Sequence, residues 1–183
     1  MNFSNMKKIV LFLFFITHTI FAQTEMTTTT GVINFEASVP FYEEVTATNK
    51  TVFCSLDLKK GSITTKVKMK EFRFKLSLME EHFNKKYLET DRYPKANFKG
   101  TIEGFNIDII EKNPKEFTIK GELKIHGKTK KITTKAFLKK VENGLEIISD
   151  FKVNTKDFNI QIPEIFSIKV AETVNVKFYF FVK

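Results

Sequence analysis

The most informative stretch of this chain is LSLMEEHFNKKYLETDRYPKANFKGTIEGFNIDIIEKNPKEFTIKGELKIHGKTKKI, residues 76–132. It begins with an amphipathic pattern that predicts a helix over residues 76–88. Strand patterns follow at 97–104 and 117–126, and a turn at Gly127-Lys128 leads into a return strand. The sequence on both sides is almost entirely strand-like. Because a single helix among many strands must pack over part of the sheet, we expect it to lie over the mouth of a small barrel.

The predicted helix has a start signal and one apolar stripe. Ser77 and Glu80 have the spacing of a capping box, in which the hydroxyl and the carboxylate bind free amide groups of the first turn. The stripe recurs at near-helical spacing and consists of Leu76, Met79, Phe83 and Tyr87. Two roles remain open for this stripe: it closes the barrel core, or it forms a lid that touches a ligand.

Strand patterns account for most of the remaining chain. Alternating apolar and polar residues predict strands over 31–39, 51–59, 62–70, 97–104, 117–126, 129–138, 145–153 and 170–183. Turn signals between them include Lys60-Gly61 and Asn143-Gly144. The pattern therefore predicts an all-β fold with one short inserted helix: an antiparallel up-and-down β-barrel of about eight strands. The outward-facing residues are mostly Lys, Thr, Glu and Asn, which excludes a transmembrane barrel.

Two glycines share the inward-facing phase of the strand predicted at 97–104. Gly100 and Gly104 alternate there with Phe98 and Ile102. Glycine inside a strand marks a sharp bend or the close approach of another group. A barrel corner and space for a ligand chain both remain open as explanations.

The N-terminus has the pattern of a secretory signal peptide over residues 1–22. Lys7-Lys8 precedes an apolar run from Ile9 to Phe21, and Ala22 suits cleavage before Gln23. A membrane anchor is the alternative, but the run is shorter than the roughly 20 residues that span a bilayer. We therefore expect a periplasmic or secreted protein, with a loose polar leader at 23–30 and one domain at 31–183.

The charge and the reactive residues point away from nucleic acid and from catalysis. The formal net charge of +9 comes almost entirely from dispersed lysines, which suggests solvated strand faces and a peripheral contact with anionic membrane surfaces. Cys54 falls on an apolar strand phase and is expected to be buried. His82 and His126 are expected at the surface, too far apart in sequence to suggest a metal site. We expect no cofactor, no metal and no enzymatic activity.

Several motifs together carry a resemblance to a known family. The segments YPKANFKG (93–100), GELKIHGKTKKI (121–132) and DFNI (157–160), with Phe83 and Tyr87 on the helix, resemble the YceI-like family over roughly residues 31–183. The resemblance implies a lipocalin-like barrel that holds a long isoprenoid or other lipid chain. Departures from the family pattern are the absence of Trp, FKLS at 74–77 in place of an Arg-Asp pair, Thr155 where Arg is common, and Asn159 in place of Gly.

Our functional prediction combines this resemblance with the 16 phenylalanines that remain of the chain's 21 once the predicted signal peptide is removed. We expect sequestration or carriage of a polyisoprenoid, isoprenoid quinone or fatty lipid, with the helix and residues 158–166 as gates. The predicted tunnel lining is Phe35, Phe72, Phe74, Met79, Phe83, Phe98, Phe151, Phe158, Ile162 and Phe166. The alternative is a filled barrel that acts in envelope stress or docks through its lysine-rich exterior to an acidic partner or membrane. The oligomeric state stays open, a homodimer included.

Overall fold

The computed structural model describes residues 24–164 and 168–183, so the predicted signal peptide and Phe166 lie outside the described residues. The strands are β1 (Glu25–Ser38), β2 (Thr46–Asp57), β3 (Ser62–Lys68), β4 (Arg73–Phe74), β5 (Lys95–Ile102), β6 (Lys115–Ile125), β7 (Lys128–Val141), β8 (Gly144–Asn154) and β9 (Val170–Val182). The helical segments are η1 (Met69–Glu71), α2 (Ser77–His82), η2 (Phe83–Tyr87), η3 (Ile107–Ile109) and η4 (Thr155–Phe158).

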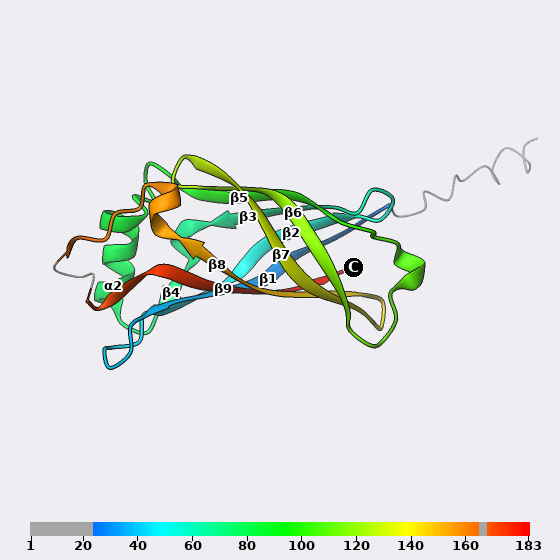
Figure 1. The fold of residues 1–183 in the computed structure, drawn as a ribbon, viewed down its shortest axis with the longest axis horizontal. Coiled ribbons are helices and arrows are strands. Elements are labelled where there is room, and N and C mark those ends of the chain that lie inside the picture. The colour runs from blue at the N-terminus through cyan, green and yellow to red at the C-terminus, as the bar shows by residue number, and fades with distance from the viewer. Residues whose placement is uncertain (1–23, 165–167) are drawn as a thin grey trace, which may run out of the picture.

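The strands form a closed antiparallel barrel, as predicted. The order around the sheet is β1-β9-β8-β7-β6-β5-β3-β2-β4, and β1 also pairs with β2, which closes the ring through the eight long strands. The two-residue β4 continues the edge of β3 along β2 after η1. Each long strand therefore pairs with its neighbours along the chain, and the first and last strands close the up-and-down barrel. Figure 1 shows α2 across one end of this barrel.

The predicted polar leader at 23–30 is wrong for most of its length. β1 already begins at Glu25, and residues 25–28 pair in register with β2, from Glu25 opposite Asp57 to Thr28 opposite Cys54. Threonine favours strands, and the strand neighbour supplies the backbone partners that a free leader would lack. The residues that appeared featureless in sequence are therefore part of the barrel wall.

The inserted helix is present, but its predicted cap is not. The N-cap is Leu76, which makes no side-chain hydrogen bond to the helix, and α2 passes directly into the π-helical turn η2. Because the N-cap is Leu76 rather than the predicted Ser77, Glu80 lies one position too late for a capping box. Its carboxylate accepts a hydrogen bond from the Phe74 amide at 3.2 Å instead, which ties α2 to β4.

Two predicted turns shift by one residue for a conformational reason. His126 (φ +48°) and Gly127 (φ +75°) occupy the turn between β6 and β7, and Glu142 (φ +47°) begins the turn between β7 and β8. Tight hairpins favour positive φ at their central positions because that twist matches the twist of the strands. The turns therefore centre on 126–127 and 142–143, one residue before Gly127-Lys128 and Asn143-Gly144.

The barrel end opposite α2 is filled with apolar side chains. Fully buried residues there include Val52, Cys54, Leu56, Ile102, Leu138, Leu145, Ile147 and Val182. The buried position predicted for Cys54 is confirmed, and burial raises the pKa of its thiol to about 12. Within 24–164 and 168–183, no helix has the length and apolar character needed to cross a bilayer.

Candidate functional site

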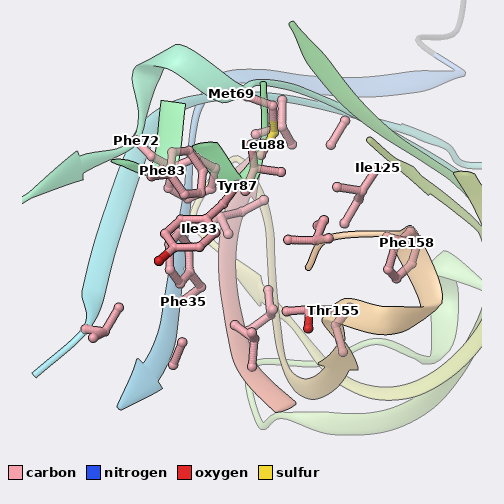
Figure 2. A pocket seen from close by; sticks show the side chains of 18 of the residues that line it. Ile33, Phe35, Met69, Phe72, Phe83, Tyr87, Leu88, Ile125, Thr155 and Phe158 are labelled. Carbon is pink, nitrogen blue, oxygen red and sulfur yellow. The ribbon is translucent and has the colours of Figure 1, made fainter. Parts of the chain in front are cut away.

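A cavity of about 520 Å³ occupies the α2 half of the barrel. Its lining comes from the inward phases of the strands and from α2, η2, η4 and the β1–β2 connection. Ile63, Ile119 and Phe180, each almost fully buried, line its inner end against the filled half of the core. The interior is therefore packed at one end and hollow at the other. Figure 2 shows side chains that line the hollow end, among them Phe83 and Phe158.

Four phenylalanine rings join the inserted helix to the barrel wall. Phe83 of η2 stacks on Phe35 of β1 with ring centroids 5.5 Å apart, and lies 5.2 Å from Phe74 and 5.7 Å from Phe72. Phe35 in turn contacts Phe72 at 5.2 Å and Phe74 at 5.6 Å. Such pairs contribute about 0.5–1.5 kcal/mol each beyond area burial. The helix is thus both a core element and part of the cavity lining, and its contact with a ligand stays a prediction.

The two inward-facing glycines differ in role. Gly100 pairs with Gly121 on β6, and a Cβ on either residue would meet Phe98 Cζ at 2.6 Å. The Phe98 ring, which lines the cavity, therefore lies over both glycines and fills the space that side chains would take. Gly104 lies beyond the end of β5 with φ +66° and belongs to a turn rather than to a strand.

The structure places nearly all the predicted tunnel residues on one cavity. Those that line it are Phe35, Phe72, Phe74, Met79, Phe83, Phe98, Phe151, Phe158 and Ile162. Phe166 lies outside the described residues. Their roles in binding stay a prediction. Phe178 and Phe180 also line the cavity, stacked 4.6 Å apart, and were missed although they share the inward phase of the last strand.

Few polar side chains reach the cavity. Thr134 Oγ1 lies 3.0 Å from Ser149 Oγ, and the Ser149 hydroxyl donates to the Lys135 carbonyl at 2.7 Å, so this pair is satisfied within the wall. Thr155 lines the cavity from η4 with its hydroxyl buried, and that oxygen has no hydrogen-bond partner among the residues that the structure describes. Sequence periodicity carries no signal for Thr155, because it lies just beyond β8.

The surface position predicted for His126 is wrong. Its side chain is only 10 % exposed, with Nε2 2.9 Å from Glu89 Oε2 and Nδ1 3.1 Å from the Phe158 carbonyl oxygen. The Tyr93 ring lies against it at 4.4 Å. The left-handed backbone at His126 accompanies this inward position, and the side chain joins the segment after η2 to η4. His82 is half-buried and lines the cavity.

Several charged groups of the described chain form ion pairs at the surface. Examples are Lys130 with Asp157 at 3.1 Å and Lys85 with Glu81 at 2.9 Å. Within residues 24–164 and 168–183, no group of three or more His, Cys, Asp and Glu side chains is placed to hold a metal ion. The site therefore offers apolar contact area, aromatic rings and the buried, unpaired hydroxyl of Thr155.

Solved structures share this architecture at low sequence identity. A polyisoprenoid binding domain from Saccharophagus degradans, implicated in plant cell wall breakdown, superposes with a TM-score of 0.76 at 13 % identity, covering 87 % of this chain and 98 % of its own. BcnA from Burkholderia cenocepacia gives 0.67 at 18 %, covering 84 % and 96 %. The YceI protein of Campylobacter jejuni gives 0.52 at 14 %, covering 73 % and 81 %.

At these low identities, the superpositions establish a shared fold and nothing more. The family is established by a match between the sequence and a family model. No curated protein matches the chain. The model of the YceI-like domain matches residues 14–181, which is most of the chain. This chain belongs to the YceI-like family.

Proposed function

We propose that this protein binds a long apolar lipid in the α2-end cavity and carries or sequesters it without making or breaking bonds. The observation that carries the proposal is a cavity of about 520 Å³ lined almost entirely by apolar side chains. This volume lies within the range of small-molecule sites, ~300–1,000 Å³. Each buried CH₂ of a ligand contributes about 0.8 kcal/mol, so a chain of isoprene or acyl units gains affinity with length.

The ligand class is a polyisoprenoid, an isoprenoid quinone or a fatty lipid. Membership of the YceI-like family supports this class, as does the fold shared with a polyisoprenoid binding domain from Saccharophagus degradans. The filled-barrel alternative has no specific observation in its favour, whereas the cavity supports a carrier. A binding role also agrees with the site, which offers contact area rather than paired acids, bases or nucleophiles.

A membrane surface is the proposed place of loading. Large apolar side chains are exposed near the cavity mouth: Phe41 and Tyr42 in the β1–β2 connection, Leu76 and Leu78 at α2, and Ile168 before β9. Leu76 and Leu78 also line the cavity, so the exposed apolar surface continues into the interior. Such a rim suits shallow insertion into the interface of a bilayer, where the lipid ligand resides.

A vesicle-binding experiment tests the rim. We expect the double variant Phe41→Asp, Leu78→Asp to bind anionic phospholipid vesicles more weakly than the wild type in a flotation assay. Ile109→Asp is the control, because Ile109 is exposed on η3, in the connection after β5 and so at the opposite end of the up-and-down barrel. Equal flotation of the wild type and the double variant would remove the membrane contact from the proposal.

The cleaved signal peptide and the periplasmic or secreted location are part of the same proposal. Lys7-Lys8 and the apolar run that follows support them. Intact-mass measurement of protein isolated from envelope or medium is expected to give a chain that begins at Gln23. A mature chain that retains residues 1–22 would contradict cleavage and favour the anchor.

Native mass spectrometry before and after organic extraction tests the binding proposal itself. We expect a bound mass that is lost on extraction and matches an isoprenoid or acyl lipid. A bare protein mass, with no uptake of added quinone or prenyl lipid, would overturn the carrier function.

A further inference from the structure

Thr155 is an exception among the buried polar side chains of the described chain. It is 8 % exposed, and its Oγ1 has no hydrogen-bond partner there. Several other buried polar side chains are satisfied: Asn49 donates to the Lys68 carbonyl at 3.0 Å, and the Thr90 hydroxyl binds Asn84 Oδ1 at 3.0 Å. Native proteins pair nearly all such groups, so the unpaired hydroxyl requires an explanation.

The hydrogen bonds that the structure shows at the start of η4 are made without this hydroxyl. Asn154 is the N-cap of η4, and its Oδ1 accepts from the Lys156 amide at 2.9 Å, the role that a threonine hydroxyl takes at other helix starts. The Thr155 carbonyl accepts from the Ile160 amide at 3.1 Å, which closes the turn. The backbone is therefore satisfied around Thr155 while its side chain is not.

The surroundings hold Thr155 in a defined position beside the cavity. Lys130 pairs with Asp157 at 3.1 Å, and His126 contacts the Phe158 carbonyl oxygen at 3.1 Å, so η4 is tied to both ends of the β6–β7 hairpin turn. In Figure 2, Thr155 and Phe158 lie on one side of the cavity and Phe35, Phe72 and Phe83 on the other. A ligand that packs on the aromatic rings therefore faces η4 and Thr155 across the cavity.

The charges of the lining indicate which kind of polar group fits. The lysine and carboxylate side chains that line the cavity, Lys169 and Glu43, are both exposed, so neither supplies a buried charge beside Thr155. A buried phosphate without a cation is strongly disfavoured, whereas a neutral oxygen needs only a hydrogen bond. The hydroxyl both donates and accepts, so it suits a carbonyl, an ester or an alcohol.

We propose that the Thr155 hydroxyl hydrogen-bonds to a neutral oxygen in the head group of the bound lipid and thereby selects oxygen-bearing lipids over hydrocarbons of the same chain. This inference depends on the proposed lipid-binding function and names the chemistry of its ligand. Thr155 is a specificity residue: the apolar lining provides most of the affinity, and the hydroxyl distinguishes the head group.

The test compares two probes that differ by one hydroxyl, geranylgeraniol and the geranylgeranyl hydrocarbon that lacks it. Competition between them on the full mature chain, read by native mass spectrometry, is expected to favour the alcohol by roughly tenfold, as one neutral hydrogen bond allows. Thr155→Val, which has the same shape, is expected to reduce that preference to near one while keeping the affinity for the hydrocarbon. Thr155→Ser is expected to retain the preference.

A matched control changes a lining hydroxyl that already has a partner. Thr134→Val removes the group that contacts Ser149, and we expect the preference for the alcohol to persist. Thr155→Ala serves as a second variant should Thr155→Val fold poorly by circular dichroism. Loss of affinity for both probes alike in the Thr155 variants would mean that Thr155 acts through shape, and would overturn the inference.

The outcomes separate this inference from the proposed function. If the wild type takes up neither probe, nor any other prenyl or acyl lipid, the lipid-binding function fails. If it takes up both probes without preference, or if Thr155→Val keeps the preference, the function stands and the role of Thr155 is overturned.

Discussion

Phe35 of β1 and Phe83 of η2 stack with ring centroids 5.5 Å apart and an angle of 21° between their planes. The two residues are far apart in sequence, and their contact is where the inserted helix meets the barrel wall. Both rings also line the cavity. The element that closes the mouth is therefore held by the same aromatic surface that would contact a ligand.

We expect Phe83→Asp to weaken lipid binding by roughly tenfold or more while leaving a β-type circular dichroism spectrum. The substitution removes a large apolar surface from the cavity and puts a charge among three rings. Binding of a prenyl lipid is measured by native mass spectrometry. Phe137→Asp is the matched control, because Phe137 is 45 % exposed and does not line the cavity. Unchanged affinity in a folded Phe83 variant would show that the helical lid does not contribute to lipid binding.

The Gly100–Gly121 pair predicts that the barrel wall has no room for a side chain at position 121. We expect Gly121→Ala to destabilise the protein by about 1–3 kcal/mol, the usual cost of overpacking. The new Cβ would meet the Lys99 carbonyl oxygen as well as the Phe98 ring. Thermal unfolding measures the effect. Gly104→Asn is the control, since a Cβ at Gly104 meets nothing within 4 Å and asparagine tolerates positive φ. Equal losses in both variants would contradict the packing argument.

Cys54 predicts a pH effect on stability. Burial raises the pKa of its thiol from 9.0 to about 12, so above about pH 9 the unfolded chain loses a proton that the folded chain keeps. Stability contributed by this group is complete below pH 9 and is lost as the pH rises toward 12. We expect the stability advantage of the wild type over Cys54→Ala to shrink by up to about 1.4 kcal/mol per pH unit between about pH 9 and pH 11. Urea unfolding curves measure it, and a constant difference across this range would contradict the buried thiol.

The Glu89–His126 contact predicts local control of η4. We expect Glu89→Ala to lower stability by about 1 kcal/mol, since Glu89 is partly exposed, and to speed amide hydrogen exchange in residues 155–160. His126 would keep only its contact with the Phe158 carbonyl oxygen. Hydrogen exchange with mass spectrometry locates the change, and the exposed Glu122→Ala on β6 is the control. If exchange rises equally in both variants, or in neither, the Glu89–His126 contact does not stabilise η4.

Local patterns in the sequence were sufficient for the strand phases. The alternation at Leu145, Ile147 and Phe151 correctly placed their side chains inside, because neighbouring residues of a strand point to opposite faces. Turn residues were located to within one position, since positive φ restricts which residues fit a tight hairpin. The start of β1 was missed because a threonine-rich run has weak alternation and its pairing partner lies in β2.

Local patterns were enough to predict the all-β class, the inserted helix, most of the inward-facing residues and the family, because period, turn chemistry and motif are properties of neighbouring residues. Packing between distant segments sets which end of the barrel is hollow, how deeply His126 is buried, and that Thr155 Oγ1 lacks a partner among the described residues. Each of these depends on side chains from segments distant in sequence. Cavities and unpaired groups are properties of packing between segments, which no local pattern records.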